Sequence, residues 1–154
     1  MLLAAALILA GCGGKSGAKP HVVAGDGFRF EVAAGWKVER TPQRITARHG
    51  STFVQVSTFR LIKQYKPALF DAVATELSTR MRQVAQQVGG NLEQHGVVAV
   101  DGIRAHAYRV TSNDRLDDYT FVLSGKLEYQ LLCHRKRHAA SGACRTLVRS
   151  FALA

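Results

Sequence analysis

Two cysteines and two histidines near the C-terminus form the densest set of side chains that could do chemistry. Cys133, His134 and His138 lie close together, and Cys144 follows. Zinc takes thiolates and imidazoles, so a zinc site is one interpretation. However, the run 135–137 places three cations between the imidazoles, and Cys133 and His134 point to opposite faces of a predicted strand. We therefore predict a Cys133–Cys144 disulfide and no metal, with two free thiols as a further alternative.

The third cysteine, Cys12, ends an apolar run at the N-terminus. Residues 2–10 are all apolar, and the run closes with Leu-Ala-Gly before Cys12. This pattern resembles the bacterial lipobox, although residues 1–11 carry no Lys or Arg. The resemblance implies a diacylglycerol on the Cys12 sulfur and cleavage just before it. The alternative is an N-terminal core helix whose cysteine is incidental.

These features predict the organisation of the chain. Residues 1–11 would be a lipoprotein signal peptide, 12–24 the lipidated cysteine with a flexible tether of small and polar residues, and 25–154 one domain. The 154 residues are 47% hydrophobic, enough for one core. We therefore expect a protein anchored by lipid to the extracytoplasmic face of the cell membrane.

The chain is strongly basic, with 21 Lys and Arg against 11 Asp and Glu and a net charge of +10. Its only dense cationic run is Arg135, Lys136 and Arg137. The run lacks interleaved aromatic residues, so we predict no nucleic-acid partner. We expect these three residues to form a contact surface for a protein or an anionic envelope component. The alternative is a solvated basic face without a partner.

Strand patterns alternate around one long helix. A stripe of apolar residues predicts a helix over 67–88, which Gly89 and Gly90 end. Asp101-Gly102 between apolar runs predicts a hairpin over 97–110, and 113–117 is predicted to be a polar loop. Another alternating pattern ends at Cys133, and a short helix should contain Cys144. The sequence therefore predicts a one-domain α+β fold, an antiparallel sheet flanked by helices.

No enzymatic signature is present. His95 and His106 have acid–base side chains but no recognisable nucleophile, and Asp117 and Asp118 should face opposite sides of a strand. With Asp114 these carboxylates offer weak Ca²⁺ binding at most. We predict no catalytic residues and no cofactor. The alternatives are an anchored envelope hydrolase built around His95 or His106, and an immunity-type lipoprotein that blocks a toxin.

Three short motifs resemble the PsbP-like superfamily. They are an aromatic strand followed by Gly-Trp, an Asp-Gly turn between two strands, and a closing Ser-Phe. In this chain they read Phe28-x-Phe30-x-Val32-x-x-Gly35-Trp36, Val98-x-Val100-Asp101-Gly102-x-x-Ala105 and Ser150-Phe151. Ala34 stands where Pro is more usual. The resemblance implies an antiparallel sheet with helices on both faces, an α/β/α sandwich, and a function in binding rather than catalysis. With the lipobox and the Cys133/Cys144 pair, the chain looks most like the actinobacterial LpqN-type lipoproteins.

Overall fold

The computed structural model describes residues 19–154, apart from the side chains of Gln94 and His95. Cys12, the predicted signal peptide and the first part of the predicted tether lie outside the described residues. The strands and helices follow one another in this order: β1 His21–Gly25, β2 Phe28–Val32, β3 Lys37–Thr41, β4 Arg44–His49, β5 Thr52–Arg60, η1 Pro67–Leu69, α1 Phe70–Gln87, β6 Asn91–Val100, β7 Ile103–Ser112, β8 Arg115–Ser124, β9 Leu127–Lys136, α2 Gly142–Ser150 and β10 Ala152–Leu153.

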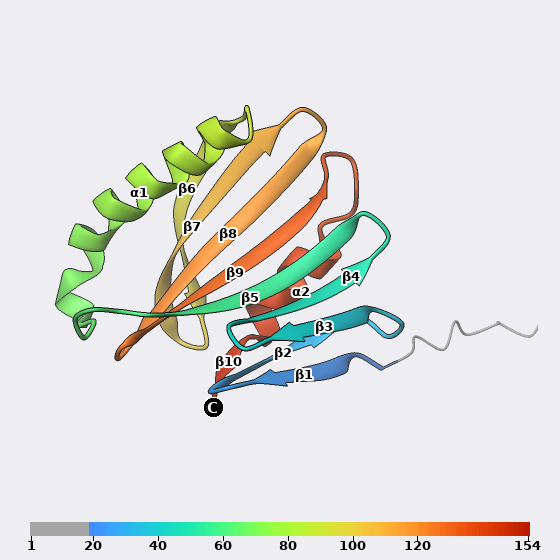
Figure 1. The fold of residues 1–154 in the computed structure, drawn as a ribbon, viewed down its shortest axis with the longest axis horizontal. Helices are drawn as coiled ribbons and strands as arrows, with labels where there is room; N and C mark the ends of the chain where they lie inside the picture. The colour runs from blue at the N-terminus through green and yellow to red at the C-terminus, as the bar shows by residue number, and fades with distance from the viewer. Residues whose placement is uncertain (1–18) are drawn as a thin grey trace, which may run out of the picture.

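Two antiparallel sheets organise the molecule (Figure 1). The larger has seven strands in the order β3-β4-β5-β9-β8-β7-β6, and the smaller has three in the order β1-β2-β10. The small sheet joins the two ends of the described chain, because Ala152 and Leu153 pair with Arg29 and Phe28. Most neighbouring strands in the large sheet follow each other in the chain and form hairpins. The exception is β5, which pairs with β9 although the helix α1 and three strands lie between them in the sequence.

Each face of the large sheet has its own core. Side chains of a strand alternate between faces. Tyr108 and Val110 of β7 pack under α1 with its Leu77 and Met81, whereas Ala105 of the same strand belongs to the other core. The helix α1 therefore covers β6 and β7 on one face, while α2 and the small sheet lie on the opposite face, with α2 over β5 and β9 (Figure 1).

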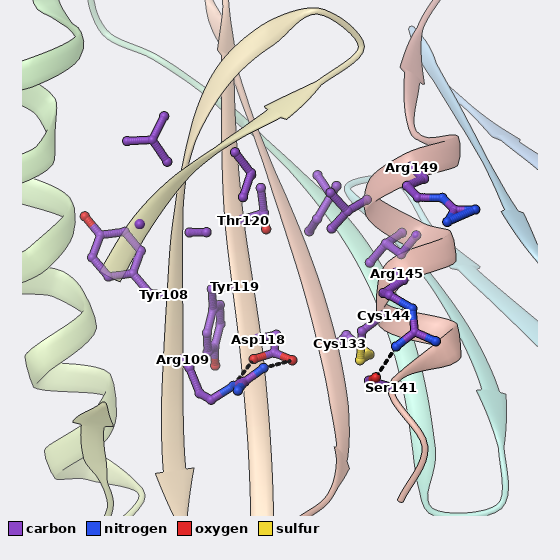
Figure 2. A pocket seen from close by; sticks show the side chains of 17 residues that line it. Tyr108, Arg109, Asp118, Tyr119, Thr120, Cys133, Ser141, Cys144, Arg145 and Arg149 are labelled. Atoms are coloured by element: carbon purple, nitrogen blue, oxygen red, sulfur yellow. Dashed lines mark hydrogen bonds and ion pairs between the residues drawn. A yellow bond between two sulfur atoms is a disulfide. The ribbon is translucent and has the colours of Figure 1, made fainter. Parts of the chain in front are cut away.

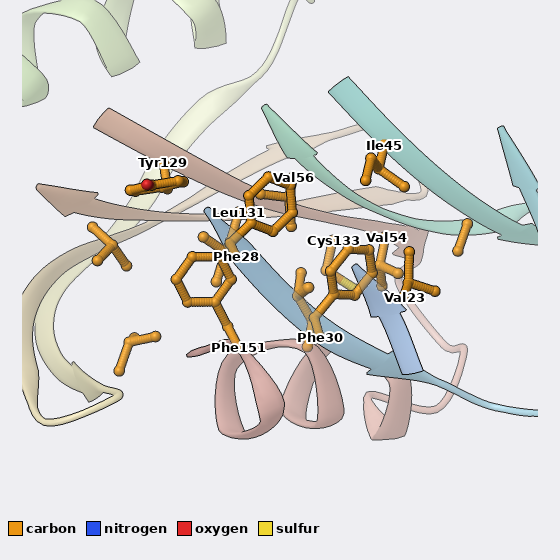
Figure 3. Close-up of a cluster of buried hydrophobic side chains, with 14 of the residues drawn as sticks. Val23, Phe28, Phe30, Ile45, Val54, Val56, Tyr129, Leu131, Cys133 and Phe151 are labelled. Atoms are coloured by element: carbon orange, nitrogen blue, oxygen red, sulfur yellow. The ribbon is translucent and has the colours of Figure 1, made fainter. Parts of the chain in front are cut away.

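The larger core lies between the seven-stranded sheet, the small sheet and α2 (Figure 3). Phe28 and Phe30 of β2 stack at 6.3 Å between ring centroids, and Phe28 lies 5.8 Å from Phe151, the residue after α2. Tyr129 of β9 meets Phe151 edge-on at 5.6 Å. The aromatic strand and the closing Ser-Phe, which are far apart in sequence, thus meet in one cluster.

The predicted hairpin and helix are confirmed. Asp101 and Gly102 both have positive φ, the backbone that a two-residue turn between β6 and β7 requires. The apolar stripe of the helix is buried at Leu77 and Met81, but Leu69 lies in the 3₁₀ turn before α1 and Val88 lies after its last residue, and both are exposed. The helix is therefore shorter than its hydrophobic pattern suggested.

Two boundaries differ from the prediction. The tether was expected to run to residue 24, but β1 pairs with β2 over its whole length and Val23 is fully buried, so ordered chain begins earlier. The segment 113–117 was expected to be a loop, but only Asn113 and Asp114 form the turn, and β8 starts at Arg115. The turn is tight because Asn113 adopts a positive φ, which asparagine tolerates.

No helix in the described part of the chain is long and apolar enough to cross a bilayer.

Candidate functional site

The short helix α2 is fixed over the large sheet by three kinds of contact. Cys144 in its first turn is bonded to Cys133 of β9, with 5.3 Å between the Cα atoms. Leu147 is buried in the core one turn later, and the Ser150 hydroxyl accepts a hydrogen bond from the Glu31 amide at 2.8 Å. This placement confirms the predicted disulfide and gives α2 a defined position relative to the sheet.

A groove of about 460 Å³ runs between α2 and the strands β6, β7 and β8 (Figure 2). The small sheet and α2 leave this part of the sheet uncovered. Its floor consists of small or short side chains, among them Gly96, Val98, Ala107 and Thr120. These residues keep the floor low, because larger side chains at the same positions would fill the space.

An ion pair closes one end of the groove. Arg109 of β7 donates from Nε and Nη2 to the Asp118 carboxylate on β8, at 2.5 and 3.1 Å (Figure 2). Arg135 of β9 lies on the other side of the same carboxylate, 4.0 Å from Nε to Oδ2. The hydrogen bond to Asp118 raises the pKa of the Arg109 guanidinium, although burial opposes it. One carboxylate thus lies between two guanidinium groups.

The helix side of the groove is cationic at its rim. Arg145 and Arg149 of α2 line the groove and are exposed, and Val148 contributes an apolar surface between them. Arg145 also donates to the Ser141 hydroxyl. The charged residues that line the groove are three arginines and one aspartate. Its chemistry suits a ligand with an apolar part and a negatively charged group.

The predicted contact surface at 135–137 is divided by the structure. Arg135 is only 6% exposed and donates from Nη1 to the carbonyl oxygens of Arg137 and Ala139, at 3.3 and 3.1 Å. It therefore holds the loop between β9 and α2 in shape and is not part of the exposed surface. Lys136, the last residue of β9, and Arg137, on the loop that leads into α2, are exposed.

The histidines considered for catalysis are placed differently. His106 is buried under α1, stacked on Phe70 at 3.9 Å between ring centroids, with its Nε2 2.9 Å from the Phe70 carbonyl oxygen. His95 lies on β6, the neighbouring strand. His134 is the histidine that meets a carboxylate, at 2.5 Å from Nδ1 to Asp117 Oδ1, on the face opposite the groove. Neither His106 nor His134 lines the groove.

Adjacent carboxylates point to opposite faces, as the strand pattern predicted. Asp117 binds His134 on one face and Asp118 binds Arg109 on the other. Cys133 and His134 alternate in the same way, and Cys133 is consumed by the disulfide. Within residues 19–154, no group of three or more His, Cys, Asp and Glu side chains is close enough to hold a metal ion.

Sequence reasoning missed the ion pair and the floor of the groove. Arg109 and Asp118 are equally distant from the Asn113-Asp114 turn, so a correctly placed turn would have paired them. Because 113–117 was predicted to be a loop, the pairing of Arg109 with Asp118 was not predicted. The floor gave no signal, because Gly96, Ala107 and Thr120 come from three strands and become neighbours only through the sheet register.

Comparisons with known proteins show the fold. No family model matches the sequence, and no curated protein sequence matches it. The solution structure of cyanobacterial PsbP (CyanoP) from Synechocystis sp. PCC 6803 matches with a TM-score of 0.66 and 17% identity, over 95% of this chain and 99% of that one. A crystal structure from Bacteroides thetaiotaomicron VPI-5482 matches with a TM-score of 0.52 and 10% identity, over 90% of this chain and 49% of that one. At these identities the likeness concerns architecture, and the chain has a PsbP-like α+β fold.

Proposed function

We propose that this protein is an extracytoplasmic lipoprotein, anchored to the cell membrane through Cys12, whose domain binds a protein or an envelope component without converting it chemically. The N-terminal lipobox pattern supports the anchor, and together with the Cys133/Cys144 pair and the domain it suggests an LpqN-type lipoprotein. The PsbP-like fold agrees with the three motifs that suggested a binding domain of that superfamily. The ligand is recognised in the groove beside α2. Its chemistry combines an apolar part with a negatively charged group.

The groove is the observation that carries this proposal. Its apolar floor favours an apolar part of the ligand, because burying such surface contributes about 25 cal/mol per Å². Its rim presents the exposed guanidinium groups of Arg145 and Arg149. Guanidinium groups bind carboxylate and phosphate oxygens in a bidentate manner, so the rim favours an anionic group.

The lining of the groove favours binding over catalysis. Its charged side chains are three arginines and Asp118, which Arg109 already holds. Arginine stays protonated at ordinary pH, so it does not act as a general acid or base. The disulfide fixes one wall, so the groove is preformed, which lowers the entropic cost of binding.

Site-specific photo-crosslinking in the native membrane tests the groove. A benzoylphenylalanine at Val148 faces the groove, and one at Ala72 lies on the exposed side of α1. We expect a discrete adduct from position 148 and none from position 72. The adduct should disappear in Arg145→Glu/Arg149→Glu and persist in Arg29→Glu/Arg82→Glu, which changes the charge equally at exposed positions elsewhere.

Equal labelling from both positions, or an adduct that does not change when the rim arginines are replaced, would contradict the proposed site.

The anchor is tested separately, by mass spectrometry of the membrane-extracted protein and of Cys12→Ala. We expect an N-terminal peptide that starts at a diacylated Cys12, and release of the variant from the membrane fraction. An unmodified Cys12 would refute the lipoprotein assignment and leave the groove untouched.

A further inference from the structure

The segment that joins β5 to α1 exposes an unusual amount of apolar surface. Six large hydrophobic side chains are exposed among the described residues, and three of them lie between residues 59 and 69. Phe59 is 45% exposed, Ile62 98% and Leu69 44%. A single exposed hydrophobic residue is ordinary, but a cluster of them marks an interaction surface. We call residues 59–69 the apolar–basic segment.

Cations surround this apolar surface. Arg60, Lys63 and Lys66 are exposed within the segment, and no Asp or Glu occurs between Glu39 and Asp71. The exposed Lys126 joins them from the turn between β8 and β9, next to Leu127, the partner of Arg60 in the sheet. One end of the molecule therefore combines a bare Ile62 side chain with several positive charges.

The apolar–basic segment is held in place by the turn beside it. The Leu61 amide donates to the Lys126 carbonyl oxygen at 2.9 Å, and the Tyr65 amide donates to the Gly125 carbonyl oxygen at 2.7 Å. These two bonds fix the backbone on either side of Ile62. The isoleucine thus stands at the tip of a short loop whose ends are tied to the sheet.

We propose that the apolar–basic segment docks on an anionic membrane surface, with Ile62 inserted at the level of the headgroups and Lys63 and Lys66 against the lipid phosphates. An interfacial site combines apolar insertion with basic residues in this way. A soluble polyanion would bind the lysines but leave Ile62 in water. The segment lies outside the groove beside α2. Tyr65 and Pro67 line a second hollow of about 400 Å³, but Ile62, Lys63 and Lys66 do not line it and stand free on the surface.

This contact goes beyond the proposed function and does not depend on the lipid at Cys12. In Figure 1 the turn between β5 and α1 lies at the left end of the molecule, whereas the chain enters β1 at the right. No residue of the apolar–basic segment lines the groove beside α2. The proposals for the docking surface, the groove and the anchor can therefore each be tested and refuted independently.

A tryptophan placed at the tip reports the contact directly. The full chain carrying Cys12→Ser and Trp36→Phe has no lipid and no native tryptophan, since the sequence has only one. Ile62→Trp in this chain should show a blue-shifted emission with vesicles of phosphatidylcholine and 30% phosphatidylglycerol, and quenching by brominated acyl chains. Pure phosphatidylcholine should give a much weaker response. The same reporter at Val88, which is 45% exposed just after α1, should not respond.

The lysines set the strength of the contact. One cation near an anionic bilayer contributes about 1 kcal/mol, so each of Lys63→Gln and Lys66→Gln should lower the partition coefficient about fivefold. Lys37→Gln, at the start of β3, and Lys136→Gln, at the end of β9, each remove one charge outside the segment and should leave the partition coefficient nearly unchanged. No blue shift at position 62, an equal shift at position 88, or equal losses in the segment and control lysine variants would overturn the proposal. Circular dichroism confirms that each variant is folded.

Discussion

Removing the Cys133–Cys144 disulfide should destabilise the domain by a calculable amount. The bond closes a loop with a sequence separation of 11. In the chain-entropy model such a loop costs the unfolded chain about 9 cal/mol/K, which is about 2.8 kcal/mol at 25 °C. For a domain of this size that corresponds to a fall in Tm of about 10 °C. The native fold should survive, because Leu147 and Phe151 remain buried.

The assay is urea unfolding of Cys133→Ala/Cys144→Ala, in a Cys12→Ala background that leaves no other thiol. The background alone is the matched control, with and without reductant. We expect the double variant to unfold at lower urea with a slightly larger m-value, because the unfolded chain without the bond is more expanded. The reduced control should behave like the variant.

A loss below about 1 kcal/mol would refute this reasoning, because the entropic contribution would then be absent or offset by strain. An unchanged m-value together with a loss of the expected size would place the effect in native contacts instead.

Three further predictions concern the core under α1, the stability of the domain at alkaline pH and the glycine before β6. Leu77→Ala, at a fully buried position under α1, should cost about 2–5 kcal/mol in urea unfolding, and a smaller loss would mean that α1 collapses onto the cavity. Burial raises the pKa of Tyr119 to about 12. The stability that the protonated side chain contributes is therefore complete below pH 10 and is lost as the pH rises from 10 to 12. Tyr119→Phe should make the fall in Tm over that range less steep, and an identical fall in both proteins would contradict the assignment. Gly90→Ala would bring a Cβ within 2.3 Å of the Thr111 carbonyl oxygen, so we expect a loss of stability larger than that of Gly89→Ala or a shift of the β6 start, measured by hydrogen exchange.

Much of the fold was readable from local pattern. The turn at Asp101-Gly102, the stripe through Leu77 and Met81, and the alternation that ends at Cys133 each report a structure formed by neighbours in sequence. These signals depend on backbone preferences and on periodicity, which a single sequence displays. The disulfide followed from the same pattern, because it placed both cysteines between the sheet and the last helix.

The rest depended on partners far along the chain. Val23 looked like part of a tether, because a single strand of five residues is recognisable only with its neighbour, and β2 supplies it. Arg135 looked like an exposed cation, because the sequence does not show that its guanidinium turns into the following loop. The groove likewise exists only through the register of three strands.

The small sheet has a consequence for how the chain is made and moved. Phe28 and Phe30 are buried only when α2 and Phe151 arrive, and β2 acquires its second neighbour only from β10, at the end of the chain. Contacts between residues so distant in sequence form late, because the loop between them must close first. A nascent chain therefore cannot complete this domain before β10 has left the ribosome. For a protein that has to cross the membrane to the extracytoplasmic side, as proposed above, this delay would keep the chain unfolded and therefore competent for translocation.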